Sequence, residues 1–247
     1  MSRNYKVQTR FLFHTNIKIK IPEDYYTETV FDELYSILED VNEKYNSYSE
    51  NSFIDRINRN NGNFVEVNEE MIEILERVVY FSDMMNGEYD ITIMPLIKLW
   101  GFYKKSDVRI PEKENISEKN EQGYVTRILL NSYKEKDDED LFDIKISDES
   151  YCTSNQGNTF VEIDNQKYGH ILSPKTGYPG KNKQIGIVTK EAFVGDIIST
   201  GLYNQSPEKF FEILDRLNRE IKVEGYMIDE KGKIHYSKGF WKYVVNE

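Results

Sequence analysis

The sequence predicts a mixed α/β (α+β) fold, in which helices pack against mixed sheets. Alternating or continuous apolar residues, as in β-strands, recur in both halves of the chain. Apolar residues at helical spacing occur between them, for instance Val30, Leu34 and Val41. Strands and helices are interleaved without a regular βαβ rhythm, so we do not expect a doubly wound parallel sheet.

The first predicted elements occupy the N-terminal third. Residues 16–21 alternate between polar and apolar side chains, which predicts a half-buried strand ended by Pro22. A helix follows over residues 30–41. A second helix is expected to begin at an Asn68 cap and to end at Asn86-Gly87, where glycine suits the left-handed stop.

The central segment, residues 106–149, has a different character. It is rich in charged residues and contains one short apolar patch, at 125–130. Such charge runs are typical of a solvated helix face and a loop.

Strand patterns return from residue 160 onward. Asp164-Asn165 predicts a hairpin turn between strands at 160–163 and 167–170. A buried strand at 185–189 leads to a helix from about Phe193. The remaining predicted elements are a helix that starts at Ser206-Pro207 and a closing hairpin formed by residues 223–228 and 234–236.

Composition excludes several classes of function. The 247 residues carry 13% aromatic side chains and a net charge of −11 with a pI near 5.0. That charge repels nucleic acid and anionic lipid, so we expect neither as a partner, although a local cation or metal would still allow a nucleotide ligand. Cys152 is the only cysteine, which excludes an internal disulfide and a thiolate zinc site.

The N-terminus has no apolar run long enough for a signal peptide or a membrane span, and no early cysteine that could accept a lipid. We therefore expect a cytoplasmic protein without a membrane span. An exported form trimmed of its leader would have the same sequence. There are no internal repeats and no linker, and we predict a single domain over residues 1–247.

Three stretches combine residues that are unusual for plain structure. The first, residues 87–102, crowds a helix stop, an acid, a hydroxyl and a proline before two aromatic residues. Such a loop could hold a planar ring and hydrogen-bond to its edge. A structural turn is the alternative.

The second stretch is residues 170–179, a rigid loop with two prolines and one glycine. Thr176-Gly177 can offer backbone N–H groups to a phosphate, and Lys175 supplies a positive charge. His170 opens the loop, either as a catalytic group or as a structural histidine.

The third stretch is residues 196–200. On a helix, Asp196 and Thr200 are four residues apart and share a face, where they could offer two oxygen ligands to a hard cation such as Mg²⁺. Alternatively, the threonine hydroxyl bonds to its own helix backbone.

Taken together and in order, these stretches resemble the ApbE-type family of FAD:protein FMN transferases. Residues 45–58 resemble the family's S-x-Y…S…N segment, and residues 87–102 resemble G-x-F-D-P-T…P-L…W-G-F. Residues 153–155 resemble T-S-G, 170–179 resemble H-I-[ID]-D-P-R-T-G-Y-P, and 196–200 belong to a segment similar to A-D-A-L-[AS]-T. The resemblance spans most of the chain.

The resemblance implies an ApbE-like flavin transferase fold and a Mg²⁺-dependent enzyme. Members of the family cleave FAD and attach FMN to a threonine or serine hydroxyl of a partner protein, which is covalent flavinylation. His170 matches the family's functional histidine, and Asp196 and Thr200 match its metal-binding acid and hydroxyl. The positions that match the flavin-nucleotide site are Ser47, Tyr48, Asp90, Thr92, Gly123, Thr176 and Gly177.

The chain also departs from the family pattern. The central segment, residues 103–150, is shorter than usual, and within it Gln122 replaces a lysine and Arg127 an aspartate. Ser173 replaces the acid that usually follows the histidine, so we expect a poorer base for activating an acceptor hydroxyl.

Three hypotheses follow. The first is an FMN transferase that uses FAD and acts on an unidentified acceptor protein. No stretch of the chain resembles the family's acceptor motif, so the acceptor is expected to be a different protein. The second is a non-catalytic or degenerate flavin-binding relative, favoured by Gln122. The third is a module on the same scaffold that holds no flavin.

Overall fold

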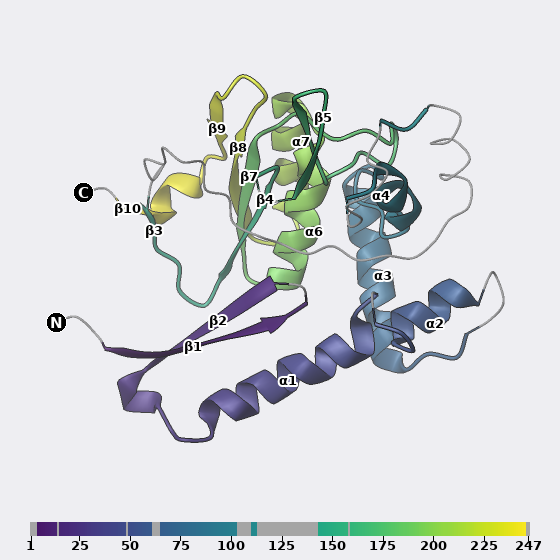
Figure 1. Ribbon diagram of the computed structural model, residues 1–247. Coiled ribbons are helices and arrows are strands. Elements are labelled where there is room, and N and C mark those ends of the chain that lie inside the picture. The colour runs from purple at the N-terminus through teal and green to yellow at the C-terminus, as the bar shows by residue number, and fades with distance from the viewer. Residues whose placement is uncertain are drawn as a thin grey trace. The chain divides into compact units, whose positions relative to one another are not determined.

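Figure 1 shows the computed structural model, which describes residues 4–13, 15–47, 49–60, 65–102, 110–112, 143–157 and 159–245. The chain divides into two compact units, Met1–Val67 and Asn68–Glu247. The elements confirm the predicted mixed α/β class. The prediction of one domain over residues 1–247 stays a prediction, and most of the shortened centre lies outside the described residues.

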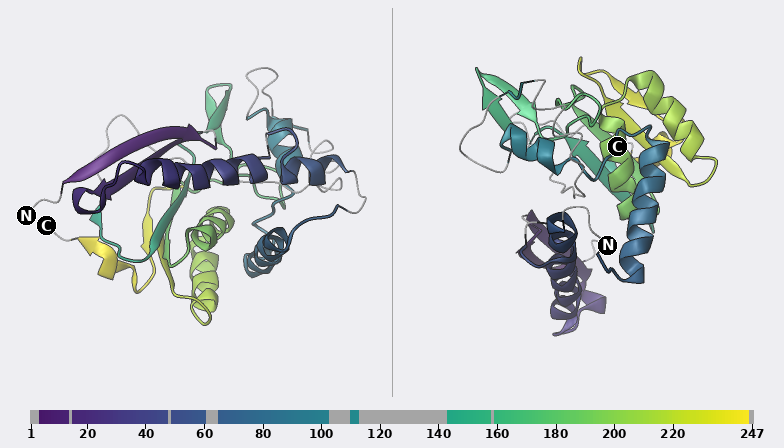
Figure 2. Two further views of the ribbon diagram at one scale, coloured as in Figure 1. Left: turned by 90° about the horizontal axis from the view of Figure 1, so that it is seen from below. Right: turned by 90° about the vertical axis from the view of Figure 1, so that its right-hand side faces the viewer.

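The first unit is built around a β-hairpin and a long helix. The strands β1 (Tyr5–Leu12) and β2 (Thr15–Pro22) pair antiparallel, with Val7 opposite Lys20. The short η1 (Glu23–Tyr25) leads to α1 (Val30–Tyr45), which lies along the hairpin (Figure 2, left). The buried Tyr35 fixes this packing, because its hydroxyl lies 2.8 Å from the carbonyl oxygens of both strands.

A short helix, α2 (Phe53–Arg59), completes the first unit. Its N-cap is Ser52, whose side chain accepts a 3.0 Å hydrogen bond from the backbone N–H of Asp55. Serine favours this position because its hydroxyl satisfies one of the orphan donors of the first turn. The helix therefore begins where its sequence supplies a cap.

The second unit contains a four-stranded antiparallel sheet in the order β4-β7-β8-β9. These strands are β4 (Ser150–Asn155), β7 (Gln184–Thr189), β8 (Val223–Ile228) and β9 (Ile234–Tyr236). The register places Ser150 opposite Thr189 at one end of the β4–β7 pair and Asn155 opposite Gln184 at the other. The predicted strands at 185–189, 223–228 and 234–236 are confirmed.

Helices cover one face of this sheet. The helices α6 (Ala192–Tyr203) and α7 (Pro207–Leu217) pack against the strands, and α3 (Glu69–Met84) packs against α6. Their apolar sides share one core with Ile185, Ile187 and Met227, none of which is exposed. Figures 1 and 2 show α6 and α7 on the same side of the sheet. The predicted Asn68 and Ser206 caps are both confirmed by side-chain hydrogen bonds.

The other face of the sheet is aromatic. Tyr226 packs there against Phe240, which belongs to the short helix η2 (Phe240–Tyr243). The chain then ends its described part as β10 (Val244–Val245), which pairs antiparallel with β3 (Asp143–Ile144). The sheet is thus buried on both faces over its centre.

A second apolar cluster forms beside the sheet. It joins α4 (Met94–Trp100) to the hairpin of β5 (Phe160–Ile163) and β6 (Gln166–Gly169). The predicted turn at Asp164-Asn165 is confirmed, and both residues have positive φ (51° and 61°). Trp100 lies at the centre of the cluster and is fully buried.

The expectation that residues 87–102 form a loop is wrong for residues 94–100, and the contact of this stretch with a planar ring stays a prediction. Residues 94–100 form α4, with Pro95 in its first turn and Gly101 as a left-handed C-cap. The indole of Trp100 packs inside the protein between Phe102, Tyr168 and Tyr178. Trp100 is therefore a core residue.

In the part of the chain that the structure describes, no helix is both long enough and apolar enough to cross a membrane.

Candidate functional site

The loop at residues 170–180 follows β6 and is closed by its own backbone. Leu172 and Pro179 form an isolated antiparallel bridge, and the N–H of Ser173 donates to the Tyr178 carbonyl oxygen over 2.9 Å. Gly177 has a φ of 71° and donates its N–H to the Ser173 carbonyl oxygen over 2.7 Å. The loop is a tight turn that favours glycine at residue 177.

Side chains from three other segments hold this loop. The Trp100 indole N–H donates to the carbonyl oxygen of Gly177 over 2.8 Å. Asn204, which caps α6, donates to the carbonyl oxygen of Leu172 over 3.2 Å. Gln156, just after β4, donates to the carbonyl oxygen of Gly180. The loop is thereby fixed to α4, α6 and the end of β4.

Of the predicted phosphate-side pair, Gly177 uses its N–H inside the loop. The Thr176 hydroxyl oxygen accepts a 3.2 Å hydrogen bond from the Tyr178 N–H. Both residues therefore shape the turn in this structure, and their contact with a phosphate stays a prediction.

His170 stands at the start of the loop with one defined tautomer. Its Nδ1 lies 3.0 Å from the carbonyl oxygen of Thr159, which also accepts the backbone N–H of His170 over 3.1 Å. A carbonyl oxygen only accepts, so Nδ1 carries the proton, and Nε2 is the unprotonated nitrogen of the neutral ring. Burial lowers the pKa of His170, with the Thr159 contact opposing it, so the ring is neutral near pH 7.

Asp90 and Thr92, two predicted flavin-site residues, contact each other. Asp90 Oδ1 accepts 2.7 Å hydrogen bonds from the backbone N–H and from the hydroxyl of Thr92. This side-chain turn directly precedes α4. The pair thus shapes the entrance to that helix, and its contact with a nucleotide stays a prediction.

Asp196 and Thr200 lie on α6, as the sequence predicts, one turn apart. Thr200 faces β4, where the Ser154 hydroxyl lies 3.3 Å from the Thr200 hydroxyl and 2.9 Å from that of Ser199. Ser199 donates to the helix carbonyl oxygen of Asp196 over 3.1 Å. One carboxylate and three hydroxyls are hard oxygen donors, which fits the preference of Mg²⁺.

Cys152 lies on β4 close to this group and is buried. Burial, together with the neighbouring Asp196 carboxylate, raises the pKa of the Cys152 thiol to about 11. The raised pKa disfavours the thiolate near pH 7, and the buried Cys152 packs between β4 and α6.

The other predicted cofactor residues fall elsewhere. Ser47 lies in the first unit just after α1, and its buried hydroxyl oxygen has no hydrogen-bond partner within the described residues. Tyr48 and Gly123 lie outside the described residues, as do Gln122 and Arg127.

Glu88 was not singled out from the sequence, yet it contacts the 170–180 loop. Its carboxylate accepts a 2.8 Å hydrogen bond from the Ser173 hydroxyl and lies 3.3 Å from the Lys175 ammonium group. The 85 positions between Glu88 and Ser173 explain why no local pattern indicated the contact.

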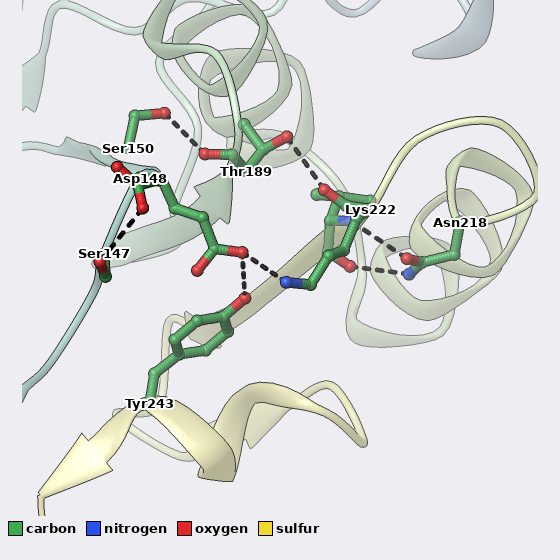
Figure 3. A network of polar contacts seen from close by, with 9 residues as sticks. Ser147, Asp148, Ser150, Thr189, Asn218, Lys222 and Tyr243 are labelled. Carbon is green, nitrogen blue, oxygen red and sulfur yellow. Dashed lines mark hydrogen bonds and ion pairs between the residues drawn. The ribbon is translucent and has the colours of Figure 1, made fainter.

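A separate open pocket of about 490 Å³ lies at the opposite end of β4 and β7. Figure 3 shows Lys222 and Tyr243 in the polar network next to this pocket. Both side chains donate hydrogen bonds to the Glu149 carboxylate, over 2.6 and 2.9 Å. The hydrogen bond from Lys222, and then that from Tyr243, lowers the pKa of Glu149. The charges of Lys222 and Glu149 neutralise one another, so this pair stabilises the fold.

Comparison with known proteins gives a consistent result. The sequence profile of the ApbE family matches residues 13–145 and 127–227 of this chain. The FAD:protein FMN transferase of Escherichia coli K12 is 23% identical, over 73% of this chain and 72% of that protein. That of Haemophilus influenzae is 28% identical over 113 residues, which are 44% of this chain and a third (33%) of that protein.

Solved structures share the fold. The ApbE protein of Thermotoga maritima superposes with a TM-score of 0.84 at 19% identity, over 98% of this chain and all (100%) of that one. The flavinyl transferase ApbE of Pseudomonas stutzeri, in its apo form, gives 0.75 at 18% identity, over 98% and 97% of the two chains. At these identities the likeness concerns the fold alone.

Proposed function

This chain belongs to the ApbE family, and on that premise we propose that it transfers FMN from FAD to a threonine or serine hydroxyl of an acceptor protein in a Mg²⁺-dependent reaction. The relatives that carry the name FAD:protein FMN transferase support the reaction class. The acceptor is a different protein of unknown identity.

The single observation that carries this proposal is the state of His170. Its Nδ1–H is committed to Thr159, so Nε2 keeps a lone pair, and burial holds the ring neutral. A neutral imidazole with one oriented nitrogen is the usual general base near pH 7. The loop that carries it is fixed by Trp100 and Asn204, as preorganised catalysis requires.

In the proposed step, His170 Nε2 takes the proton from the acceptor hydroxyl. The acceptor oxygen then bonds to the phosphorus of the FMN half of FAD. The phosphoanhydride bond breaks, and AMP leaves with the bridging oxygen. No electrons are exchanged with a redox partner, because the flavin is carried unchanged.

Asp196 and Thr200 are the residues that would hold Mg²⁺, with Ser154 orienting the threonine hydroxyl. When bound, the cation neutralises the pyrophosphate and the charge that develops on AMP. The residues of this chain supply oxygen donors of the matching hardness.

The test is chromatography of FAD, FMN and AMP after incubation of the purified protein with FAD and Mg²⁺. Water replaces the missing acceptor slowly, so we expect AMP release that EDTA abolishes and that His170→Ala lowers about 10²–10⁴-fold, the usual worth of a general base. Calorimetric titration with FAD measures binding in parallel. Tight binding with FAD recovered intact would favour the non-catalytic flavin-binding relative, which Gln122 in place of a lysine also favours. If FAD does not bind at all, both the FMN transferase and the non-catalytic flavin-binding relative are ruled out.

A further inference from the structure

A carboxylate reaches the 170–180 loop from a different segment of the second unit. Glu88 Oε2 accepts the Ser173 hydroxyl over 2.8 Å, and Oε1 lies 3.3 Å from Lys175 Nζ. The Glu88 side chain is only 10% exposed, whereas that of Lys175 is 52% exposed. The two oxygens of one buried carboxylate thus bind two side chains of the same loop.

The turn that presents Glu88 is well defined. Asn86 and Gly87 have positive φ values of 55° and 72°, which reverse the chain after α3. The N–H of Gly87 donates to the Ser82 carbonyl oxygen over 2.9 Å, and that of Glu88 to Met85 over 3.2 Å. The next residue, Tyr89, is buried in the core that α3 and α6 share. Glu88 therefore projects from a rigid base.

The contact with Glu88 compensates for the replacement of the family's acid by Ser173. The family pattern has an acid at this position of the loop, and this chain has a hydroxyl. The structure nevertheless has a carboxylate there, because Glu88 supplies one from the facing turn. The residue at position 173 is therefore no acid itself, but its hydroxyl contacts one in the folded chain.

We propose that Glu88 is a positioning residue, which holds Ser173 and Lys175 and thereby keeps the loop in the form that binds the FAD pyrophosphate. This inference rests on the proposed function. Charge-assisted hydrogen bonds are about twice as strong as neutral ones, and loss of Glu88 would leave the buried Ser173 hydroxyl without this acceptor. Lys175 would lose the partner that limits its rotamers.

The experiment moves the carboxylate from one segment to the other. Glu88→Ala should lower the melting temperature of the flavin-free protein by about 5 °C and raise the dissociation constant for FAD about tenfold. Ser173→Asp alone should likewise lower the melting temperature and raise the dissociation constant for FAD, because two carboxylates then face each other. The double variant Glu88→Ala/Ser173→Asp should recover to within about 2 °C and about threefold of the parent protein. Additive losses in the double variant would overturn the proposal.

A second variant separates positioning from simple packing. Glu88→Gln keeps an acceptor for Ser173 but loses the ion pair with Lys175. We expect a nearly unchanged melting temperature and FAD binding weakened about three- to fivefold. Glu88→Gln that binds FAD as well as the parent would show that Lys175 is not positioned by this contact and would overturn the proposal.

Glu73→Ala, which removes an exposed carboxylate from α3, is the matched control for charge. If the unsubstituted protein does not bind FAD, the proposed function fails. The melting temperatures of the flavin-free variants then decide whether Glu88 clamps the loop.

Discussion

The indole N–H of Trp100 donates a 2.8 Å hydrogen bond to the carbonyl oxygen of Gly177, and both groups are buried. The bond joins the last residue of α4 to the left-handed residue of the 170–180 loop. A core tryptophan thus holds the turn that carries His170 and the predicted phosphate contacts. Stability and ligand binding are coupled at this position.

We therefore predict that Trp100→Phe destabilises the protein and weakens FAD binding together. The Gly177 carbonyl loses its donor and the core loses volume, which costs about 2 kcal/mol or more and lowers the melting temperature by roughly 4–8 °C. Urea unfolding and calorimetric titration with FAD measure the two effects.

The second tryptophan is a matched control. Trp241 is 55% exposed and packs on Tyr236 on the far face of the sheet. Trp241→Phe should leave the free energy of unfolding and the FAD affinity nearly unchanged. The tryptophan fluorescence of this variant comes from Trp100 alone. Equal losses in the two variants would contradict the role of the Gly177 contact.

The titration of His170 gives a second prediction. Because burial lowers its pKa, the ring should titrate below the ordinary value of about 6.5 in NMR spectra of its ring protons. His170→Gln identifies the signal among the three histidines. A midpoint at or above about 6.5 would contradict the buried neutral ring.

The same shift affects stability. Below about pH 6.5 the histidine is protonated in the unfolded chain, whereas the buried ring of folded His170 stays neutral. The free energy of unfolding therefore falls as the pH drops towards the folded-state pKa. The free energy of unfolding of the His170→Gln variant should fall less between about pH 6.5 and the folded-state pKa of His170.

The Glu149 network gives a third prediction. The pKa of this carboxylate is lowered first by Lys222 and then by Tyr243, so its contribution is present above the ordinary pKa of about 4.3 and is lost as pH falls through the lower folded value. Glu149→Gln should lower the melting temperature at pH 7 by at most about 4 °C, with a smaller difference near pH 3.

FAD binding should not change in that variant, because the network lies at the opposite end of β4 and β7 from the 170–180 loop. Glu230→Gln removes the same charge from an exposed hairpin turn and serves as the control. A large loss of FAD affinity in Glu149→Gln but not in Glu230→Gln would indicate that flavin binds near Glu149. That outcome would contradict a flavin site at the 170–180 loop.

Local signals explain which parts of the fold were predictable. Three predicted features depend only on a few adjacent residues, and the structure has all of them. They are the helix caps at Asn68 and Ser206 and the turn at Asp164-Asn165. The strand β4 was not predicted, because Ser154 and Asn155 are polar although both are buried. Ser154 is satisfied by hydroxyls of α6, which no pattern within β4 indicates.

The site was predictable only in its parts. The sequence indicated the helix face shared by Asp196 and Thr200 and the rigid loop after His170. It missed α4, whose seven residues are too few for a periodic pattern. It also missed the contacts of Glu88 and Trp100, because their loop partners are 85 and 77 positions away.

The metal assignment gives the last prediction. If Asp196 and Thr200 hold Mg²⁺ against the pyrophosphate, then Mg²⁺ should tighten FAD binding, and Asp196→Asn should reduce that enhancement about tenfold or more, because a carboxylate is a far better ligand than an amide. Thr200→Val should reduce it less, since it removes one neutral ligand. The matched control is Asp215→Asn, which changes the same charge on the exposed side of α7. The measurement is calorimetric titration with FAD at several Mg²⁺ concentrations. If the FAD affinity of Asp196→Asn still rises with Mg²⁺ as in the parent protein, the cation is not bound by Asp196 on α6.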